Sequence, residues 1–290
     1  MVLDGKKYFW RMKFWDDEGI TGAEGAWSDG SDYFVMKDNR NTYQYISYTY
    51  DAVGNITKIV NLAGNNVYGT YDYTYDNLHR LASVMVTNSP AGNYSQTYAY
   101  DSIGNITNKS DIGNYTYSQT SKTNPHAVTT TGSTNYTYDD NGNLTGDGTY
   151  TYTWDYNNRM VSSTIGDTTY NYYYDNEGNR IKKTQGANTT IYVNKYYEID
   201  PSGRITKHIY GGDDRIALTE TVSGIKTPYY VHKDHLGGSS IVTDSSGNQV
   251  ELIDYHPYGT TRLDQKAGSF ESKYKFTGKE LDSETGLYYY

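Results

Sequence analysis

The 290-residue sequence contains no cysteine, only five prolines and five phenylalanines, and no long hydrophobic run. The absence of cysteine excludes disulfide bonds and thiol chemistry, but it does not identify a cellular compartment. A membrane-spanning helix needs about 18 or more consecutive apolar residues, so no membrane span is expected. Helical periodicity is nearly absent as well, and the first residues lack the apolar core of a signal peptide. The sequence therefore predicts a β-rich chain without a membrane span.

Positive charge is also scarce. The chain has 25 Lys and Arg against 34 Asp and Glu, which leaves a formal net charge of -9, and it has no basic run. Proteins that bind nucleic acid generally present a basic surface. Nucleic acid is therefore not expected among the partners.

Tyrosine, in contrast, is abundant, with 36 residues, and aromatic residues make up 16% of the chain. The mean hydropathy of -0.82 alone would indicate disorder, but this aromatic content argues for a folded chain. One Tyr side chain can bury roughly 150–250 Å². Because a buried hydroxyl needs a partner or water, we expect sheets with a Tyr-rich face turned toward a wet or polar interior.

One ten-residue pattern recurs along the chain: Tyr-x-Tyr-Asp, then Gly-Asn, then Ile or Leu followed by Thr. Such repetition predicts a repetitive architecture. A second form of the unit carries an Arg four residues after the Asp, at Arg80 and Arg159. The copies with Gly-Asn contain Tyr48, Tyr50, Asp51, Gly54 and Asn55; Tyr98, Tyr100, Asp101, Gly104 and Asn105; and Tyr136, Tyr138, Asp139, Gly142 and Asn143.

Each position of the unit has a physical role in a β-hairpin. Tyr-x-Tyr places two rings on one face of a strand, because side chains alternate with period two. The Asp can accept a backbone N–H two residues on and so start a turn, and Gly supplies the positive φ that most residues resist. The Arg of the second form is expected to pair with a turn carboxylate or to stack on a Tyr ring. The predicted fold class is all-β, with repeated hairpins forming a curved sheet.

Three segments differ in their patterns. In residues 1–40, a strand with Trp10-Arg11 followed by Trp27-Ser28 resembles the last two strands of a fibronectin type III-like sandwich, here truncated; an irregular lead-in hairpin is the alternative. Residues 43–226 carry the repeats. Residues 227–290 carry a different set of motif residues: Asp234, Leu236 and Gly237; Thr243, Asp244 and Gly247; Tyr255, Pro257 and Gly259; Phe276 and Gly278; and Asp282, Glu284, Thr285, Gly286, Leu287 and Tyr288.

These motifs and the repeats together resemble Rhs/YD-repeat proteins, including their Rhs core-associated segment; the family is related to the C component of Tc toxins and to the teneurin YD shell. The resemblance covers residues 43–290. It implies a β-sheet that spirals into a hollow shell, which in Rhs toxins encloses a C-terminal cargo polypeptide. The aspartyl autoprotease motif of the family would lie beyond Tyr290, so the resemblance implies no enzymatic activity for this chain.

The expected function is thus a non-enzymatic scaffold without a cofactor: part of a YD-repeat shell that encloses or presents a C-terminal effector or toxin. The resemblance also implies a secreted or cell-surface bacterial protein, whose partner is the missing C-terminal cargo domain of its own polypeptide. With few repeats the shell should remain an open, curved sheet that is prone to association. The alternative function is a cell-surface adhesin or carbohydrate-binding module that binds cell-wall or surface glycans through Tyr and Trp platforms.

Three groups of side chains could carry chemistry, and for each a structural role is favoured. His232, Asp234 and His235 suggest a metal site, but in a strand the two His side chains would point to opposite faces. Asp139 begins a run of oxygen ligands like that of a calcium loop, without the required Gly and distal Glu. The third group, Asp244, Asp254, Asp282 and Glu284, could form an acid–base pair but is expected to cap turns.

Overall fold

The computed structural model describes residues 44–63, 66–117 and 124–290, and these form antiparallel sheets in which each strand pairs with the next one along the chain. The N-terminal prediction, on residues 1–40, lies outside the described residues. One sheet has nine strands: β1 (Tyr45–Tyr50), β2 (Ile56–Ala63), β3 (Asn66–Tyr75), β4 (Leu81–Thr87), β5 (Tyr94–Tyr100), β6 (Ile106–Lys109), β7 (Gly113–Thr116), β8 (Thr130–Thr131) and β9 (Thr134–Asn135).

A second sheet of fourteen strands continues the series, and a two-stranded sheet follows it. The fourteen strands are β10 (Thr137–Tyr138), β11 (Leu144–Gly146), β12 (Thr151–Trp154), β13 (Met160–Ile165), β14 (Thr168–Tyr174), β15 (Arg180–Gln185), β16 (Asn188–Asn194), β17 (Tyr197–Ile199), β18 (Ile205–Gly211), β19 (Asp214–Val222), β20 (Ile225–Lys233), β21 (Ser239–Asp244), β22 (Gln249–Tyr255) and β23 (Thr261–Lys266). The 3-10 helix η1 (Phe276–Gly278) precedes β24 (Glu280–Asp282) and β25 (Leu287–Tyr289).

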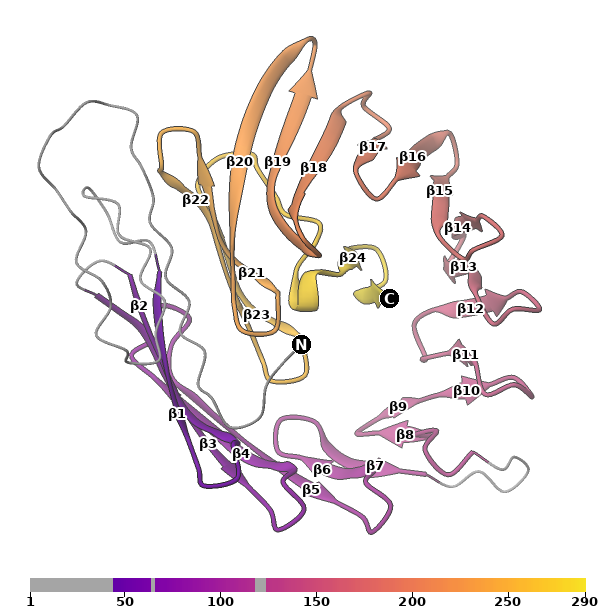
Figure 1. Ribbon diagram of the computed structural model, residues 1–290. Helices are drawn as coiled ribbons and strands as arrows, with labels where there is room; N and C mark the ends of the chain where they lie inside the picture. Colours follow the sequence, from indigo (N-terminus) through magenta and orange to yellow (C-terminus); the bar gives the residue numbers. More distant parts are fainter. Residues whose placement is uncertain (1–43, 64–65, 118–123) are drawn as a thin grey trace, which may run out of the picture.

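The two large sheets follow a curve around the C-terminal part of the chain (Figure 1). The all-β fold class is confirmed, and the curve is open: among the described strands, no backbone pairing joins β1 to β23. The change of motif near residue 227 falls within β20, and the sheet continues across it. No helix in the described residues is long and apolar enough to cross a membrane.

The Asp of each repeat unit organises the turn between two strands. Asp101 Oδ1 accepts the backbone N–H groups of Ile103 and Asn105 at 3.0 and 2.9 Å, and its Oδ2 accepts Asn105 Nδ2 at 2.9 Å. The bond from Ile103, two residues after the Asp, is the one that turn chemistry predicts, and the two bonds from Asn105, four residues after the Asp, add to it. Gly104 takes a φ of 96°, in the region that favours glycine. Every unit therefore carries its own local turn signal.

The second form of the unit uses the same turn with a different side chain. Arg80 Nε donates to Asp76 Oδ2 at 2.7 Å, and the Arg80 guanidinium lies 4.6 Å from the ring centre of Tyr100. Both of the contacts expected for Arg80 are thus present in the structure. His79 takes a φ of 62° at the position that Gly occupies in the other units. The turn geometry is therefore retained without glycine.

The aromatic residue before the Asp links consecutive hairpins. In four units its polar atom donates to the carbonyl of the residue that begins the return strand of an earlier unit: Tyr75 to Ile56, Tyr100 to Leu81, Trp154 to Leu144 and Tyr174 to Met160, at 2.7 or 2.8 Å. Tyr138, which precedes Asp139, donates to the carbonyl of Val128 outside the strands at 2.9 Å, and Tyr117, which no Asp follows, donates to that of Ile106 at the start of β6 at 2.8 Å. These bonds satisfy the buried hydroxyl or indole N–H. The repeated Tyr thus fixes the spacing between neighbouring units.

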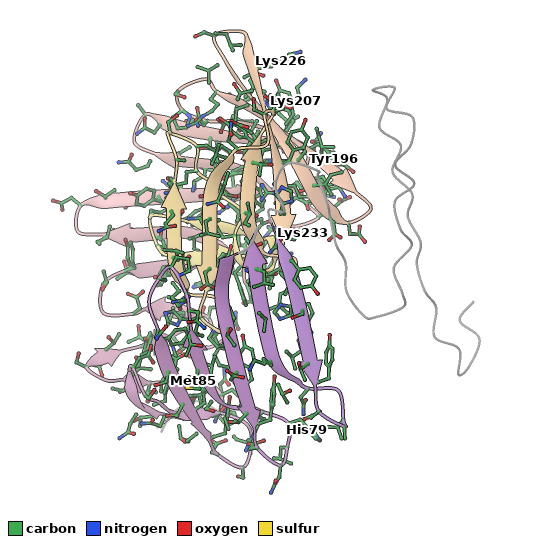
Figure 2. The ribbon with its side chains drawn as sticks, turned by 90° about the vertical axis from the view of Figure 1, so that its left-hand side faces the viewer. His79, Met85, Tyr196, Lys207, Lys226 and Lys233 are labelled. Carbon is green, nitrogen blue, oxygen red and sulfur yellow. The ribbon has the colours of Figure 1, made fainter. Side chains whose placement is uncertain are left out.

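The two faces of the sheets differ in burial, because successive side chains of a strand point to opposite faces. In β4, Val84 and Val86 are fully buried while Met85 between them is 51% exposed on the outer surface (Figure 2). In β14, Tyr172 is 2% exposed and Tyr173 is 42% exposed. One row of Tyr side chains is therefore buried inside the curve.

Candidate functional site

The candidate functional site is the C-terminal segment, residues 267–290, together with the inner face of the sheet that contacts it. After β23 the chain leaves the sheet and runs into the middle of the curve, where η1 and the β24–β25 hairpin lie (Figure 1). Its side chains contact strands that are about a hundred residues earlier in the chain, such as Arg180 with Glu280. The curved sheet therefore surrounds a segment of its own polypeptide.

Three acidic side chains attach this hairpin to β15. Glu280, Asp282 and Glu284 occupy alternate positions, and their side chains are only 5%, 2% and 8% exposed. Arg180 bridges two of them, with Nη2 at 2.8 Å from Glu280 Oε2 and Nη1 at 2.7 Å from Asp282 Oδ2. Lys183 Nζ lies 2.9 Å from Asp282 Oδ1 and 3.1 Å from Glu284 Oε1. We call these five residues the anchor cluster.

Tyrosine hydroxyls of the inner face complete the anchor cluster. Tyr192 donates to Glu280 Oε1 at 2.8 Å, and Tyr172 donates to Glu284 Oε1 at 3.1 Å. The hydroxyl of Tyr150 donates to the backbone carbonyl of Glu284. The expectation of Tyr hydroxyls in a polar interior is thus met at this site, where the interior is a segment of the chain.

The Arg180 guanidinium is also surrounded by aromatic rings. It lies 4.4 Å from the ring centre of Tyr289, 5.2 Å from that of Tyr192 and 5.5 Å from that of Tyr172. The Tyr289 hydroxyl accepts the backbone N–H of Arg180 and donates to the carbonyl of Gly178, both at 2.9 Å. Cation–π contacts strengthen when the cation is desolvated, as Arg180 is here. Arg180 therefore contacts both strands of the hairpin, through Glu280 in β24 and Tyr289 in β25.

The charges of the anchor cluster are mutually dependent. Burial alone would lower the pKa of Arg180, but Glu280 and Asp282 raise it above its ordinary value. Burial opposes the charge of Lys183 too, yet Asp282 and Glu284 raise its pKa. Desolvation makes each separate charge unfavourable, so the cluster is stable only with all partners in place. Such a cluster favours one position of the hairpin over any shifted one.

A second set of contacts holds the chain just before η1. Ser272 donates its backbone N–H to both carboxylate oxygens of Glu251, at 3.1 and 3.0 Å. Lys275 Nζ lies 2.8 Å from Asp264, and Arg215 Nη2 donates to the carbonyl of Tyr274 at 3.0 Å. The segment is therefore attached to β19, β22 and β23 as well as to β15.

Four of the C-terminal motif residues, Tyr255, Gly259, Phe276 and Tyr288, meet at one point. Phe276 packs edge-on against Tyr255, with ring centres 5.5 Å apart. A Cβ atom at Gly259 would lie 2.5 Å from Phe276 Cδ1, so only glycine allows this approach. Tyr288 donates to the carbonyl of Gly259 at 3.2 Å. These residues close the β22–β23 turn onto the C-terminal segment.

The structure separates the other candidate residues into turns and anchors. Asp139, Asp234 and Asp244 each accept backbone N–H groups in a turn. Leu236 and Gly237 belong to the turn of Asp234, Gly247 belongs to the turn of Asp244, Thr243 lies in β21, Pro257 lies in the β22–β23 turn and Gly278 ends η1. Thr285 and Gly286 lie in the turn between β24 and β25, and Leu287 begins β25.

The expectation that Asp254, Asp282 and Glu284 cap turns was wrong. The carboxylates of Asp282 and Glu284 pair with Arg180 and Lys183, and Asp254 Oδ2 accepts Arg262 Nε at 2.8 Å. Charge pairing across the chain prevails because these carboxylates are buried or half-buried, where an unpaired charge is costly.

The anchor cluster attaches the hairpin to the inner face of the sheet. Each of its carboxylates is paired with a cation or a hydroxyl. Within the described ranges no group of three or more His, Asp or Glu is placed to hold a metal ion. His232 lies in β20, whereas His235 lies in the following turn with its ring 5.5 Å from that of Tyr48.

Sequence reasoning missed Arg180, Lys183, Tyr172 and Tyr192 as partners of the C-terminal segment. One signal was available, because acidic residues at 280, 282 and 284 alternate and so share a face of an extended strand. Arg180 also follows a Gly-Asn pair, in a unit that blends the two forms of the repeat. Neither signal identifies which strand of the sheet the segment contacts.

The chain matches the family model described as teneurin YD-shell over residues 31–289. Two curated relatives are the tRNA3(Ser)-specific nuclease WapA of Bacillus spizizenii, 33% identical, and the tRNA nuclease WapA of Bacillus subtilis strain 168, 32% identical. Each alignment runs over 212 residues and covers 66% of this chain. The chain spans about a tenth of the length of these relatives, 9% in both cases.

Solved structures with a similar fold come from Tc toxins. The crystal structure of TcdB2–TccC3 matches 85% of this chain and 17% of its own, with a TM-score of 0.53 and 18% identity. The Tc holotoxin pore of Photorhabdus luminescens matches 86% of this chain and 16% of its own, with a TM-score of 0.50 and 17% identity. At this level of identity the likeness concerns the fold alone.

Proposed function

Because this chain belongs to the teneurin YD-shell family, we propose that it is a structural scaffold, part of a shell that encloses or presents a C-terminal effector. The role is non-enzymatic: the sheet excludes other molecules from the effector and fixes where the effector is attached. The partner is then the cargo domain of the same polypeptide, and the protein acts outside the cell or at its surface.

One observation carries this proposal. The C-terminal segment lies inside the curved sheet and is attached there by the buried anchor cluster. A polypeptide joined to Tyr290 would therefore start inside the curve. Buried charge networks hold a chain in a defined place, because every other register leaves a charge without a partner.

The names of the relatives support a toxic effector. Both WapA proteins are named as tRNA nucleases, and the structural neighbours are components of Tc toxins. In such an arrangement the nuclease or other toxin is a separate domain, and the repeat chain supplies the enclosure. The net charge of -9 agrees with a scaffold that does not itself bind nucleic acid.

The glycan-binding alternative gains no comparable support. A stacking platform requires exposed rings, and the buried row of Tyr71, Tyr98, Tyr152, Tyr172 and Tyr192 cannot supply one, although other rings such as that of Tyr156 are exposed. The names of the WapA and Tc toxin relatives do not refer to glycans. Glycan binding therefore stays a prediction from composition.

A protected tag tests the scaffold role. A short flexible peptide with one protease site is joined directly to Tyr290, and the same peptide is inserted in the control at the β15–β16 turn, between Gly186 and Ala187. If the scaffold encloses a polypeptide attached to Tyr290, the terminal site is cut at least about tenfold more slowly than the control site. Longer linkers should abolish this difference. Equal cutting rates without any linker would refute the proposal.

A further inference from the structure

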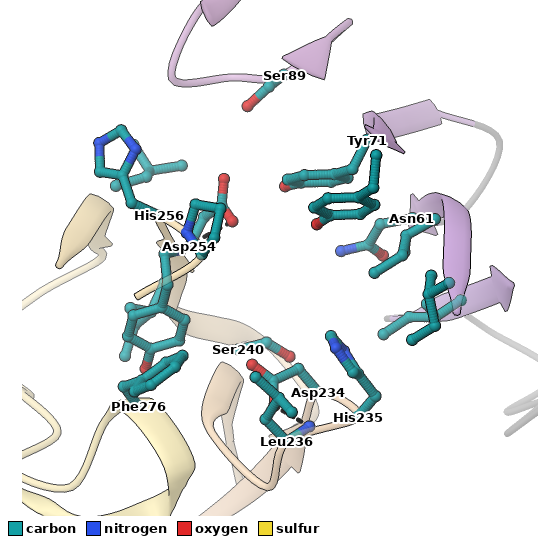
Figure 3. Close-up of a pocket in the computed structure, with 18 of the residues that line it drawn as sticks. Asn61, Tyr71, Ser89, Asp234, His235, Leu236, Ser240, Asp254, His256 and Phe276 are labelled. Atoms are coloured by element: carbon teal, nitrogen blue, oxygen red, sulfur yellow. Dashed lines mark hydrogen bonds between the residues drawn. The ribbon is translucent and has the colours of Figure 1, made fainter. Parts of the chain in front are cut away.

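A cavity of about 230 Å³ lies where the first strands of the chain meet the turns at β20–β23. Figure 3 shows Asn61 and Tyr71 on one side of it and Asp254 and His256 on the other, with Asp234 below. An engineered apolar cavity of about 150 Å³ accommodates benzene, so this one has room for a small organic molecule. The scaffold role does not require this cavity.

The walls of the cavity are held together without a ligand. Gln44 Nε2 donates to Ser240 Oγ at 2.6 Å, and the ring of Tyr48 packs edge-on against that of His235 at 5.5 Å. Both contacts join the start of the described chain to the β20–β21 region. The cavity is therefore formed in advance, which reduces the cost of ordering on binding.

The lining combines aromatic rings with negative charge. Tyr48, Tyr71 and Tyr73 face the cavity, while the described residues that line it include two Asp and neither Lys nor Arg. Asp254 is already paired with Arg262, whose Nε lies 2.8 Å from Asp254 Oδ2. The carboxylate of Asp234, next to His235, therefore has no Lys or Arg beside it in the lining.

Asp234 differs from the other turn aspartates in one respect. Its Oδ1 accepts the backbone N–H groups of Leu236 and Gly238 at 2.9 and 2.8 Å, as in the other units. Its Oδ2 accepts no hydrogen bond from the described residues, because Gly238 stands where other units carry Asn or Arg. In the equivalent turn, Asp244 Oδ2 accepts Asn248 Nδ2 at 3.0 Å.

Burial disfavours the charge of Asp234. It raises the pKa of Asp234, which the neighbouring His235 lowers and the carboxylate of Asp254 raises. Asn61 Oδ1 is a second buried acceptor on the same cavity, and it has no partner among the described residues. A ligand with hydrogen-bond donors and a positive charge would satisfy both groups.

We propose that this cavity binds a small organic cation, an ammonium group on an apolar chain, with its charge paired to Asp234 and packed against the Tyr rings. Ile59 and Leu252, both at most 7% exposed, supply apolar walls for the rest of the ligand. Aromatic rings beside a carboxylate are a recurrent way to bind ammonium groups. The site is independent of the scaffold role, since it involves neither the anchor cluster nor Tyr290.

Isothermal titration calorimetry of the 290-residue chain tests this proposal with hexylamine, which is protonated at neutral pH, and hexanol, which has the same tail without charge. Hexylammonium should bind at least about tenfold more tightly than hexanol, a difference of about 1.4 kcal/mol. The variant Asp234→Asn retains an oxygen for the turn but loses the charge, so it should weaken hexylammonium binding about tenfold and leave hexanol nearly unchanged. The control Asp244→Asn, in the equivalent turn, should change neither affinity.

Several results would overturn the proposal. Equal affinities for the amine and the alcohol would make the cavity merely apolar, and undiminished amine binding by Asp234→Asn would place the cation elsewhere. The absence of heat from either compound at millimolar concentration would exclude a preformed site. If Asp234→Asn does not fold, the comparison of hexylamine with hexanol on the unaltered chain still decides whether the cavity prefers a cation.

Discussion

Replacing Arg180 with methionine removes the cation between Glu280 and Asp282 while keeping much of the side-chain volume. Those carboxylates are 5% and 2% exposed and lie 2.8 and 2.7 Å from the guanidinium. Removing one partner of a buried pair usually costs about 3–5 kcal/mol, because a charge stays buried without compensation. Lys183 still reaches Asp282 at 2.9 Å, and Tyr192 still donates to Glu280. We therefore expect Arg180→Met to lower the free energy of unfolding by about 3 kcal/mol.

Urea denaturation followed by circular dichroism measures this loss, with Arg159→Met as the matched control. Arg159 also contacts a turn carboxylate, with Nε 2.8 Å from Asp155, and lies over the ring of Tyr174 at 5.3 Å. Its side chain is 25% exposed, however, against 2% for Arg180, and pairs screened by solvent contribute less. The control should therefore lose much less stability than Arg180→Met.

A rescue experiment separates charge from packing. In the Arg180→Met background, Glu280→Gln removes the carboxylate left without its cation, so part of the lost stability should return. Equal losses for Arg180→Met and Arg159→Met, or no recovery with Glu280→Gln, would refute the account of the anchor cluster.

Three further predictions concern pH, a close approach and a turn. Burial raises the pKa of Glu251 from 4.5 to about 7. Its contribution to stability is therefore fully present at low pH and is lost as the pH rises from about 4.5 through 7, by at most about 3 kcal/mol. The variant Glu251→Gln should remove this part of the pH dependence of urea unfolding. Gly259→Ala should cost about 1–3 kcal/mol in thermal unfolding, because the new Cβ would lie 2.5 Å from Phe276. Asp200→Ala removes the acceptor of two turn N–H groups and should cost about 1–2 kcal/mol in urea unfolding, whereas Asp200→Asn should cost less.

Each of these predictions has a control and a contradicting result. An unchanged pH slope in Glu251→Gln would show that another group titrates. Gly166, at a φ of 54° and with no atom within 4 Å of an added Cβ, is the control for Gly259, and equal losses at the two positions would exclude the steric explanation. Equal losses for Asp200→Ala and Asp200→Asn would mean that the charge, and not the turn acceptor, matters.

The hairpins could be predicted from the sequence because their determinants are local. Ten residues contain the two rings, the Asp that accepts turn N–H groups and the residue with positive φ, as Asp101 and Gly104 illustrate. The bond from Tyr100 to Leu81 joins neighbouring units and was not predicted. It depends on how two hairpins stack, which the pattern of one unit does not contain.

The candidate site could not be predicted in the same way. Glu280 and Arg180 are 100 residues apart, and nothing local at either position indicates the other. Asp282 follows the pattern of a turn aspartate, yet it pairs with Arg180 because burial makes charge compensation decisive. For Asp234 the local interpretation was incomplete: its Oδ1 caps a turn, while its Oδ2 lies beside a cavity without a hydrogen-bond donor among the described residues.

The most direct test of the central claim, that the sheet holds the C-terminal segment inside its curve, is hydrogen–deuterium exchange of residues 280–289. The amides of β24 and β25 should exchange as slowly as those of β15 in the unaltered chain, and much faster in Arg180→Met, while β4 stays protected in both. Exchange of residues 280–289 as fast as the exposed turns in the unaltered chain would contradict the claim.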